Sequence, residues 1–236
     1  MDIFSSGKLV IFFIITFSSL IFGYLYWRYF WFFRNPLRNI PKGENIVSPA
    51  DGTVVYAERV PPDKPIISVK ARKPIHVSDI FRKDLHEKKI VIGIFMSPFD
   101  VHYNRAPVSG QVAFVRHYPA RLKNHHMTSM HWRSLTKHFP IYKNSPHIVD
   151  NERTITRISG HFKTEPIACY VVQIAGGSVS GIDSYIHVND PVEKGKIFGM
   201  IRIGSQVDVI ITCSERMNVT VRPGERVRAG ETIIVE

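Results

Sequence analysis

Cysteine is scarce in this sequence of 236 residues, which contains only Cys169 and Cys213. Two cysteines exclude both a disulfide framework and a zinc site built from four cysteines. Each lies in or beside an apolar run, which favours two buried thiols. A low cysteine content also agrees with a location in the reducing cytoplasm.

Acidic residues are few as well, with 20 Asp and Glu against 31 Lys and Arg, and the formal net charge is +11. The stretch from Val101 to Val149 has no acidic residue, although it is rich in Arg, Lys and His. A solvated basic face and a contact with anionic lipid headgroups both explain this stretch. Its histidines match no standard zinc spacing and have no carboxylate beside them, so we expect no metal. No nucleic-acid-binding module is recognisable, so we expect no nucleic-acid partner.

Charge is absent from the 19 residues between Leu9 and Trp27, most of which are Ile, Phe, Leu or Val. A helix of that length covers about 28 Å, close to the hydrocarbon thickness of a bilayer. A cleaved signal peptide is the alternative, but it would end in small residues, and here Arg28 and several aromatic residues follow. More basic residues follow the segment than precede it, so the positive-inside rule places the rest of the chain in the cytoplasm. We therefore expect a membrane anchor and juxtamembrane segment at 1–37 and a separate domain at 38–236.

Helical periodicity is lacking in most of the remaining sequence, where Pro and Gly separate short apolar runs. These runs predict strands at Lys89–Ser97, Ala168–Ala175, Ile197–Ile203 and Val207–Thr212. In the last of these, Asp208 occupies a polar position that is typical of a half-buried strand. A weak helix is expected around Met127–His138.

Three segments beginning at Ser48, Ala106 and Arg222 share a turn followed by a strand. In the first two, Pro stiffens the entry and Gly permits a positive φ before the strand begins at Val. Together they resemble the small β-sandwich of biotinyl and lipoyl domains. We expect a mainly β, or β-rich α+β, domain with a barrel-sandwich core and minor helix, behind one N-terminal transmembrane helix.

Several residues in the soluble part are candidates for chemistry. In an extended segment Asp100 and His102 would share one face, where a carboxylate raises the basicity of an imidazole; the alternative is that Asp100 caps a turn. Asp51 lies in an Asp-Gly pair that is typical of a turn. Gly204-Ser205 is either a strand break or an uncrowded peptide bond that the serine hydroxyl attacks. Gly177-Ser178 lies in a loop that is either flexible or binds a headgroup, and it lacks the lysine of a P-loop.

Six segments occur in an order that is informative as a set: Tyr29–Pro36, Ser48–Gly52, Ser97–Pro107, Asn151–Arg153, Gln173–Gly176 and Phe198–Asp208. Together they resemble the phosphatidylserine decarboxylase family in its short, membrane-anchored form. The resemblance spans most of the chain.

This resemblance implies a lyase with a covalent pyruvoyl cofactor derived from Ser205. The Ser205 hydroxyl would attack the Gly204 carbonyl, and elimination and hydrolysis would release ammonia. The products would be a large chain, 1–204, and a small chain, 205–236, whose strands complete the same core. The new ketone would form a Schiff base with the serine amine of phosphatidylserine and accept electrons as CO2 leaves, giving phosphatidylethanolamine.

The family uses an Asp–His–Ser set for self-cleavage, and Asp51 and Ser205 match it. We assign the base to His102, oriented by Asp100 or Asp51, because Arg105 stands where longer members have a second histidine. Arg105 would then bind the phosphate or the carboxylate of the substrate. The short form usually continues after Gly176 with an Ala-Arg-Arg sequence that is missing here. The sequence therefore does not decide how the headgroup is bound or which serine-headed lipid is the substrate, and archaetidylserine is an alternative to phosphatidylserine.

The expected partners are an anionic phospholipid substrate, the membrane, and the two chains of one precursor; a homo-oligomer is compatible with the sequence. The main alternative is a non-catalytic, membrane-tethered adaptor built on a lipoyl-like β-sandwich. It predicts an uncut chain and gives no reason for Asp51, His102 and Gly204-Ser205 to occur together.

Overall fold

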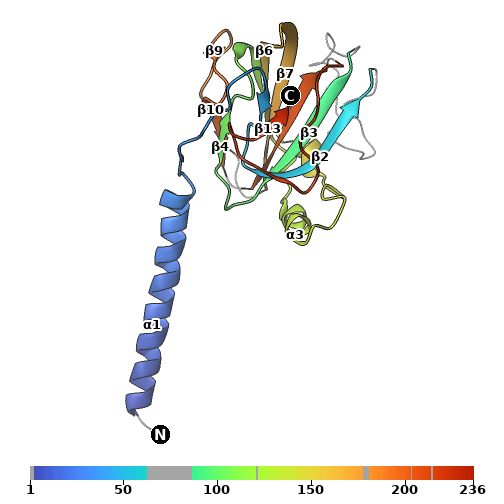
Figure 1. The fold of residues 1–236 in the computed structure, drawn as a ribbon. Helices are drawn as coiled ribbons and strands as arrows, with labels where there is room; N and C mark the ends of the chain where they lie inside the picture. Colours follow the sequence, from blue (N-terminus) through green and yellow to red (C-terminus); the bar gives the residue numbers. More distant parts are fainter. Residues whose placement is uncertain (1–2, 63–86, 121, 178–180, 203, 214) are drawn as a thin grey trace. The chain divides into compact units, whose positions relative to one another are not determined.

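The computed structural model describes residues 3–62, 87–120, 122–177, 181–202, 204–213 and 215–236. The chain forms two compact units, Met1–Pro36 and Leu37–Glu236 (Figure 1). We refer to the second as the β unit.

The first unit is helical, as the uncharged run predicts. Helix α1 spans Ile3–Tyr26 and continues as one π-helical segment, η1, over Trp27–Trp31. Within the stretch Gly7–Trp31, the most apolar window of 18 residues has a mean hydropathy of 2.2, and no part of that window is buried inside the protein. Among the described residues this is the one helix long and apolar enough to cross a membrane.

The described part of the β unit contains strands in three sheets and two short helices. The strands are β1 (Ile46–Val47), β2 (Gly52–Val60), β3 (Lys89–Met96), β4 (Tyr103–Arg105), β5 (Gly110–Tyr118), β6 (Arg153–Phe162), β7 (Glu165–Ala175), β8 (Ile182–Ser184), β9 (Pro191–Val192), β10 (Ile197–Ile201), β11 (Ser205–Thr212), β12 (Arg226–Val227) and β13 (Ile233–Val235). The helices are α3 (Thr128–Thr136) and α4 (His147–Asp150). The mainly β class is confirmed, and so are the predicted strands and the helix; Ile203 lies outside the described residues.

The largest sheet is curled and has eight strands in the order β12-β2-β3-β11-β7-β6-β5-β9 (Figure 1). A three-stranded sheet, β4-β10-β8, and the pair β1-β13 complete the unit. Neighbouring strands run antiparallel throughout the described pairings.

Strand β11 is an inner strand of this sheet, between β3 and β7, and is buried along its whole length. Alternate residues such as Val207 and Val209 pack into one apolar cluster, while Ile210 faces a second cluster that contains Met130 of α3. The prediction of a half-buried strand was therefore wrong, because apolar layers cover both faces. Asp208 is fully buried as a result.

Glycine begins strands β2 and β5, as the shared turn-strand pattern predicts, but for a different reason. Neither Gly52 nor Gly110 has a positive φ. A Cβ on Gly52 would lie 2.2 Å from the Phe95 carbonyl oxygen, and one on Gly110 would lie 2.2 Å from that of Ser159. These positions need glycine because another backbone passes too close for a side chain.

Candidate active site

Ser205 is the first residue of β11 and is fully buried. It lies opposite Met96 of β3 and Ala175 of β7, and its hydroxyl donates to Met96 Sδ at 3.3 Å. Since a thioether is a weak acceptor, this contact holds the hydroxyl loosely. Gly204 has a φ of +58°, and no atom lies within 4 Å of the position a Cβ would take. The Gly204-Ser205 peptide bond is therefore uncrowded on the glycine side.

Two amide side chains complete the surroundings of the Met96 sulfur. Asn104 Nδ2 lies 3.8 Å from Met96 Sδ, and Gln173 Nε2 donates to Asn104 Oδ1 at 2.8 Å. All three side chains are fully buried. Asn104, Gln173 and Ser205 come from three of the ordered segments noted in the sequence. Sequence reasoning gave Asn104 and Gln173 no role, although their membership of those segments was the available signal.

His102 is fully buried just before β4, and its Nδ1 lies 2.9 Å from the main-chain oxygen of Asp100. A carbonyl oxygen only accepts hydrogen bonds, so Nδ1 carries a proton, and in the neutral imidazole Nε2 is the nitrogen with the lone pair. The Asp100 carboxylate accepts a hydrogen bond from Ser97 N at 2.8 Å and pairs with Arg226. Asp100 thus closes a turn, as in the alternative considered above, and contacts the imidazole through its carbonyl.

Asp51 belongs to a separate charged cluster, partly buried near the other end of β4. Its carboxylate pairs with Arg38 at 2.9 Å and accepts a hydrogen bond from the Ala229 amide at 2.7 Å. Arg105 donates to the Gly195 carbonyl oxygen at 2.7 Å. Burial and the nearby Arg38 charge lower the Arg105 pKa. The structure therefore groups Asp51 with Arg105 at the end of β4, whereas His102 precedes the start of β4.

A pocket of about 180 Å³ lies beside Gly204. Its lining combines aromatic, imidazole and glycine residues: Phe95, Pro98, His126, Met127, Thr128, His131, Gly176, Gly177 and Gly204. The Phe95 and His131 rings have centroids 6.2 Å apart. Arg105 is not among the described lining residues. The pocket gives a small molecule access to the Gly204 end of the peptide bond.

Asn151 and Gly177 fix one wall of this pocket. Asn151 Nδ2 donates to the carbonyl oxygens of His125 and Ala175 at 2.9 and 2.7 Å, and its Oδ1 accepts from His125 N at 2.7 Å. A Cβ on Gly177 would lie 2.6 Å from His126 N. The lack of a side chain at Gly177 therefore lets the histidine segment pack against the end of β7. Ser178 lies outside the described residues.

A second polar network is buried on the opposite face of β11. His147 Nε2 donates to Gln206 Oε1 at 3.2 Å, and Gln206 Nε2 donates to Asp208 Oδ1 at 2.7 Å and lies 3.0 Å from the Tyr56 hydroxyl. Burial raises the pKa of Asp208 to about 6 and lowers the pKa of His147 to about 4. Burial and the Asp208 charge raise the pKa of Tyr56. This network, starting one residue after Ser205, was not predicted from the sequence.

Comparisons with known proteins agree with the ordered segments. Residues 25–235 match the family model described as phosphatidylserine decarboxylase. A protein of Methanocaldococcus jannaschii named as an archaetidylserine decarboxylase proenzyme is 35% identical, over 97% of this chain and 96% of its own length. Phosphatidylserine decarboxylase proenzymes of Amoebophilus asiaticus and Pelobacter propionicus are 34% and 32% identical, over 87% and 98% of this chain and 74% and 86% of their own lengths. The chain therefore belongs to the phosphatidylserine decarboxylase family and is a decarboxylase, a carbon–carbon lyase.

Proposed function

We propose that this protein cleaves itself between Gly204 and Ser205 and then converts phosphatidylserine to phosphatidylethanolamine. The observation that carries the proposal is the position of Ser205, buried at the start of β11, with Gly204 uncrowded and lining a pocket. The hydroxyl, the bond it would attack and a space for substrate thus occur at one place.

Self-cleavage begins when Ser205 Oγ attacks the Gly204 carbonyl carbon, which moves the acyl group from nitrogen to oxygen. Loss of the Ser205 α-proton then breaks the ester Cβ–O bond and frees the Gly204 carboxylate. The remaining dehydroalanine gains a proton at Cβ and becomes an imine. One water adds to the imine carbon, and ammonia leaves. The overall change consumes one water and leaves residues 1–204 and 205–236 as separate chains.

His102 is our candidate base for the first proton transfer. Its Nδ1–H is held by the Asp100 carbonyl, so Nε2 is the nitrogen able to accept a proton. Because Asp100 is itself fixed by Ser97 N and Arg226, the imidazole orientation is set by a rigid turn. Positioned general bases contribute about 10² to 10⁴ in rate.

The family implies a pyruvoyl group at residue 205, and the surroundings of Ser205 fit one. Ser205 is buried, and the preceding residue Gly204 lines a pocket. Asn104 lies beside the Met96 sulfur and accepts a hydrogen bond from Gln173. When present, such a group supplies an electron-accepting ketone for loss of CO2. The residues of the chain bind the headgroup and keep bulk water away from it.

For the substrate we assign the pocket beside Gly204 to the serine headgroup. His126 and His131 are its nitrogen-bearing lining side chains and provide hydrogen-bond donors for an anionic group. Asp51 and Arg105 lie in a charged cluster that joins the large chain to the small chain. Asp51 accepts a hydrogen bond from Ala229 of the small chain, and Arg38 pairs with Glu231 of the small chain. Asp51 then supports self-cleavage by holding the two segments together. Arg105 remains a candidate for phosphate binding.

We place the reaction at the cytoplasmic face of the membrane. Support for this comes from the apolar helix Gly7–Trp31 and from the basic residues that follow it. The positive-inside rule then orients the β unit toward the cytoplasm.

The test combines intact mass with product analysis. Purified wild-type protein should separate into two chains cut before residue 205. The mass of the small chain should be lower, by the mass of ammonia, than that of the same chain with an unmodified N-terminal serine. The processed protein should release CO2 from serine-headed lipid. Ser205→Ala should stay uncut, whereas Ser184→Ala, at an exposed serine of β8, should be cut normally. A homogeneous, uncut chain that still releases CO2 would refute self-cleavage, and an uncut inactive chain would favour the adaptor.

Archaetidylserine is a second candidate substrate, because the Methanocaldococcus jannaschii relative that is named for it matches this chain over 96% of its own length at 35% identity. The same assay with ether-linked and ester-linked serine lipids separates the two. A preference of at least about tenfold in kcat/KM for one of them identifies the substrate.

A further inference from the structure

The β unit exposes apolar side chains on and just after helix α3. Met130 of this helix is fully buried, whereas Trp132 and Leu135 are each 62% exposed and Phe139, which follows the helix, is 52% exposed. Trp132 and Leu135 are three residues apart and therefore share the outer face of the helix. A surface helix normally presents charged or polar residues on that face, so this apolar group indicates a binding surface.

The charge around this surface is positive. The sequence from Val101 to Val149 contains no acidic residue, and Lys123, Lys137 and Lys143 are exposed within it. By contrast, acidic and basic residues are paired near the start of β3 and the start of β7. Examples are Lys88 with Glu215 and Arg216 with Glu165. An exposed apolar group on a segment that has exposed lysines and no acidic residue is complementary to an anionic bilayer, which offers an apolar interior beneath negative headgroups.

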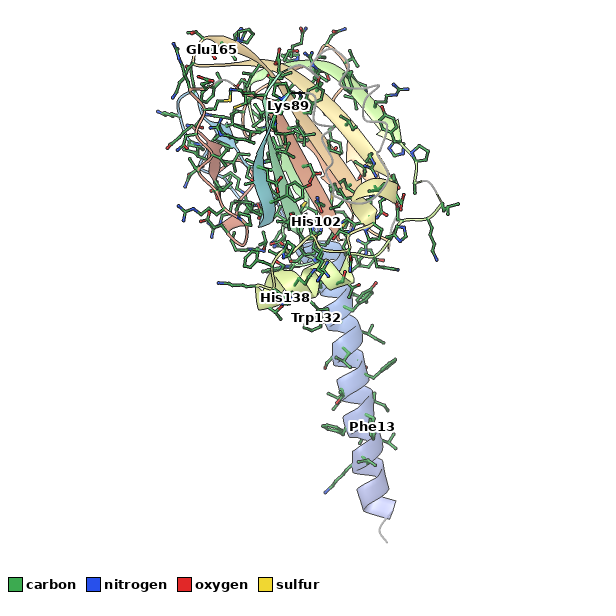
Figure 2. The ribbon with its side chains drawn as sticks, turned by 90° about the vertical axis from the view of Figure 1, so that its right-hand side faces the viewer. Phe13, Lys89, His102, Trp132, His138 and Glu165 are labelled. Carbon is green, nitrogen blue, oxygen red and sulfur yellow. The ribbon has the colours of Figure 1, made fainter. Side chains whose placement is uncertain are left out.

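Helix α3 also forms part of the pocket beside Gly204, through Thr128 and His131. Figure 2 shows Trp132 and His138 at the same end of the β unit as His102, while Lys89 and Glu165 lie at the opposite end. Whatever binds the outer face of α3 therefore also lies close to the pocket and to the Gly204-Ser205 bond.

We propose that Trp132, Leu135 and Phe139 form a membrane-docking surface that inserts into an anionic bilayer and opens the pocket directly to lipid headgroups. The β unit begins at Leu37, a few residues after a helix able to span a membrane, and this helix would tether the unit to a bilayer. The docking stands on exposure and charge alone, while its effect on turnover rests on the proposed decarboxylation.

The direct test measures fluorescence quenching of full-length protein in vesicles of phosphatidylglycerol and bromine-labelled phosphatidylcholine. The signal of Trp132 is the difference between wild type and Trp132→Phe, which removes the background of Trp27 and Trp31. A matched control adds Glu165→Trp to the Trp132→Phe protein and places an indole at the opposite end (Figure 2). We expect bromine to quench Trp132 several times more strongly than the control indole. Equal quenching of the two would overturn the proposal.

A second copy of the chain is the other possible occupant. In that case the Trp132 emission would shift to the blue as protein density in the vesicle rises, with no quenching by bromine. This result would also overturn membrane docking.

The functional arm uses the double variant Trp132→Ser, Leu135→Ser. Its self-cleavage should match wild type, which shows that it folds. Its CO2 release from phosphatidylserine in vesicles should fall at least about tenfold, while release from a soluble short-chain phosphatidylserine should stay within about twofold. Unchanged release from vesicles contradicts the proposal. If wild type releases CO2 from neither substrate, the proposed reaction fails, and the quenching measurement still decides the docking.

Discussion

Replacing either end of the buried network on β11 should give the stability of the protein opposite dependences on pH. Asp208 has its pKa raised to about 6 by burial, so the folded state holds a proton that the unfolded chain has released. Stability from Asp208 is therefore present at low pH and is lost as pH rises from about 4 to about 6. His147 has its pKa lowered to about 4 by burial, so the unfolded chain binds the extra proton and stability rises over about pH 4 to 6.5.

The two effects are of similar size. A pKa change near 2 corresponds to about 3 kcal/mol at about 1.4 kcal/mol per unit, and this holds roughly for each residue because both are almost fully buried. In the wild type they nearly cancel between pH 4 and 6. Asp208→Asn leaves the rising contribution of His147, and His147→Gln leaves the falling contribution of Asp208. Each slope should approach about 1.4 kcal/mol per pH unit, with opposite signs.

The measurement is urea unfolding of the full-length chain in detergent micelles, followed by near-ultraviolet circular dichroism at half-unit steps from pH 4.5 to 6.5. All variants carry Ser205→Ala, so that every sample is a single uncut chain. The double variant should return to the wild-type pH dependence, which controls for the other titrating groups. If the two single variants run parallel to wild type across this range, the assignment of both protonation states is refuted.

Three further changes test the site. His102→Gln should slow self-cleavage at least about 100-fold in a gel time course, and a rate within threefold of wild type would remove His102 as the base. Gly177→Ala places a methyl group 2.6 Å from His126 N and should lower the free energy of unfolding by about 1 to 3 kcal/mol while raising KM; an unchanged KM would argue against this wall binding substrate. Asn151→Ala removes three hydrogen bonds and should cost about 3 kcal/mol in urea unfolding, with Asn151→Asp intermediate; equal losses in the two variants would contradict the role of the amide.

The strands were predictable because apolar runs of strand length are strong local signals. The fully buried state of β11 was not, since the cover over Asp208 comes from segments such as α3 that are distant in sequence. Hydrophobic alternation reports the polarity of a residue and not what lies above it. The glycines of β2 and β5 show the same limit, because the backbones that approach them belong to β3 and β6.

The site was predictable as a set of segments but not as a set of contacts. The ordered motifs singled out Ser205 and His102, but they gave no indication of their contacts. The contact between Asp100 and His102 uses a main-chain carbonyl oxygen, which every residue possesses. The position of Asp51 beside Arg38 and Ala229 depends on the last strands closing over the first ones. Side-chain type alone contains no information about such long-range closure.

Strand β11 begins at the proposed cut and lies hydrogen-bonded between β3 and β7. A precursor recovering from denaturant needs only to fold one molecule, whereas a processed enzyme would have to reassemble from two. The rate at which the processed form reassembles should then depend on the square of the protein concentration, and reassembly should compete poorly with aggregation. Processing would in this way make the native state hard to regain once it is lost.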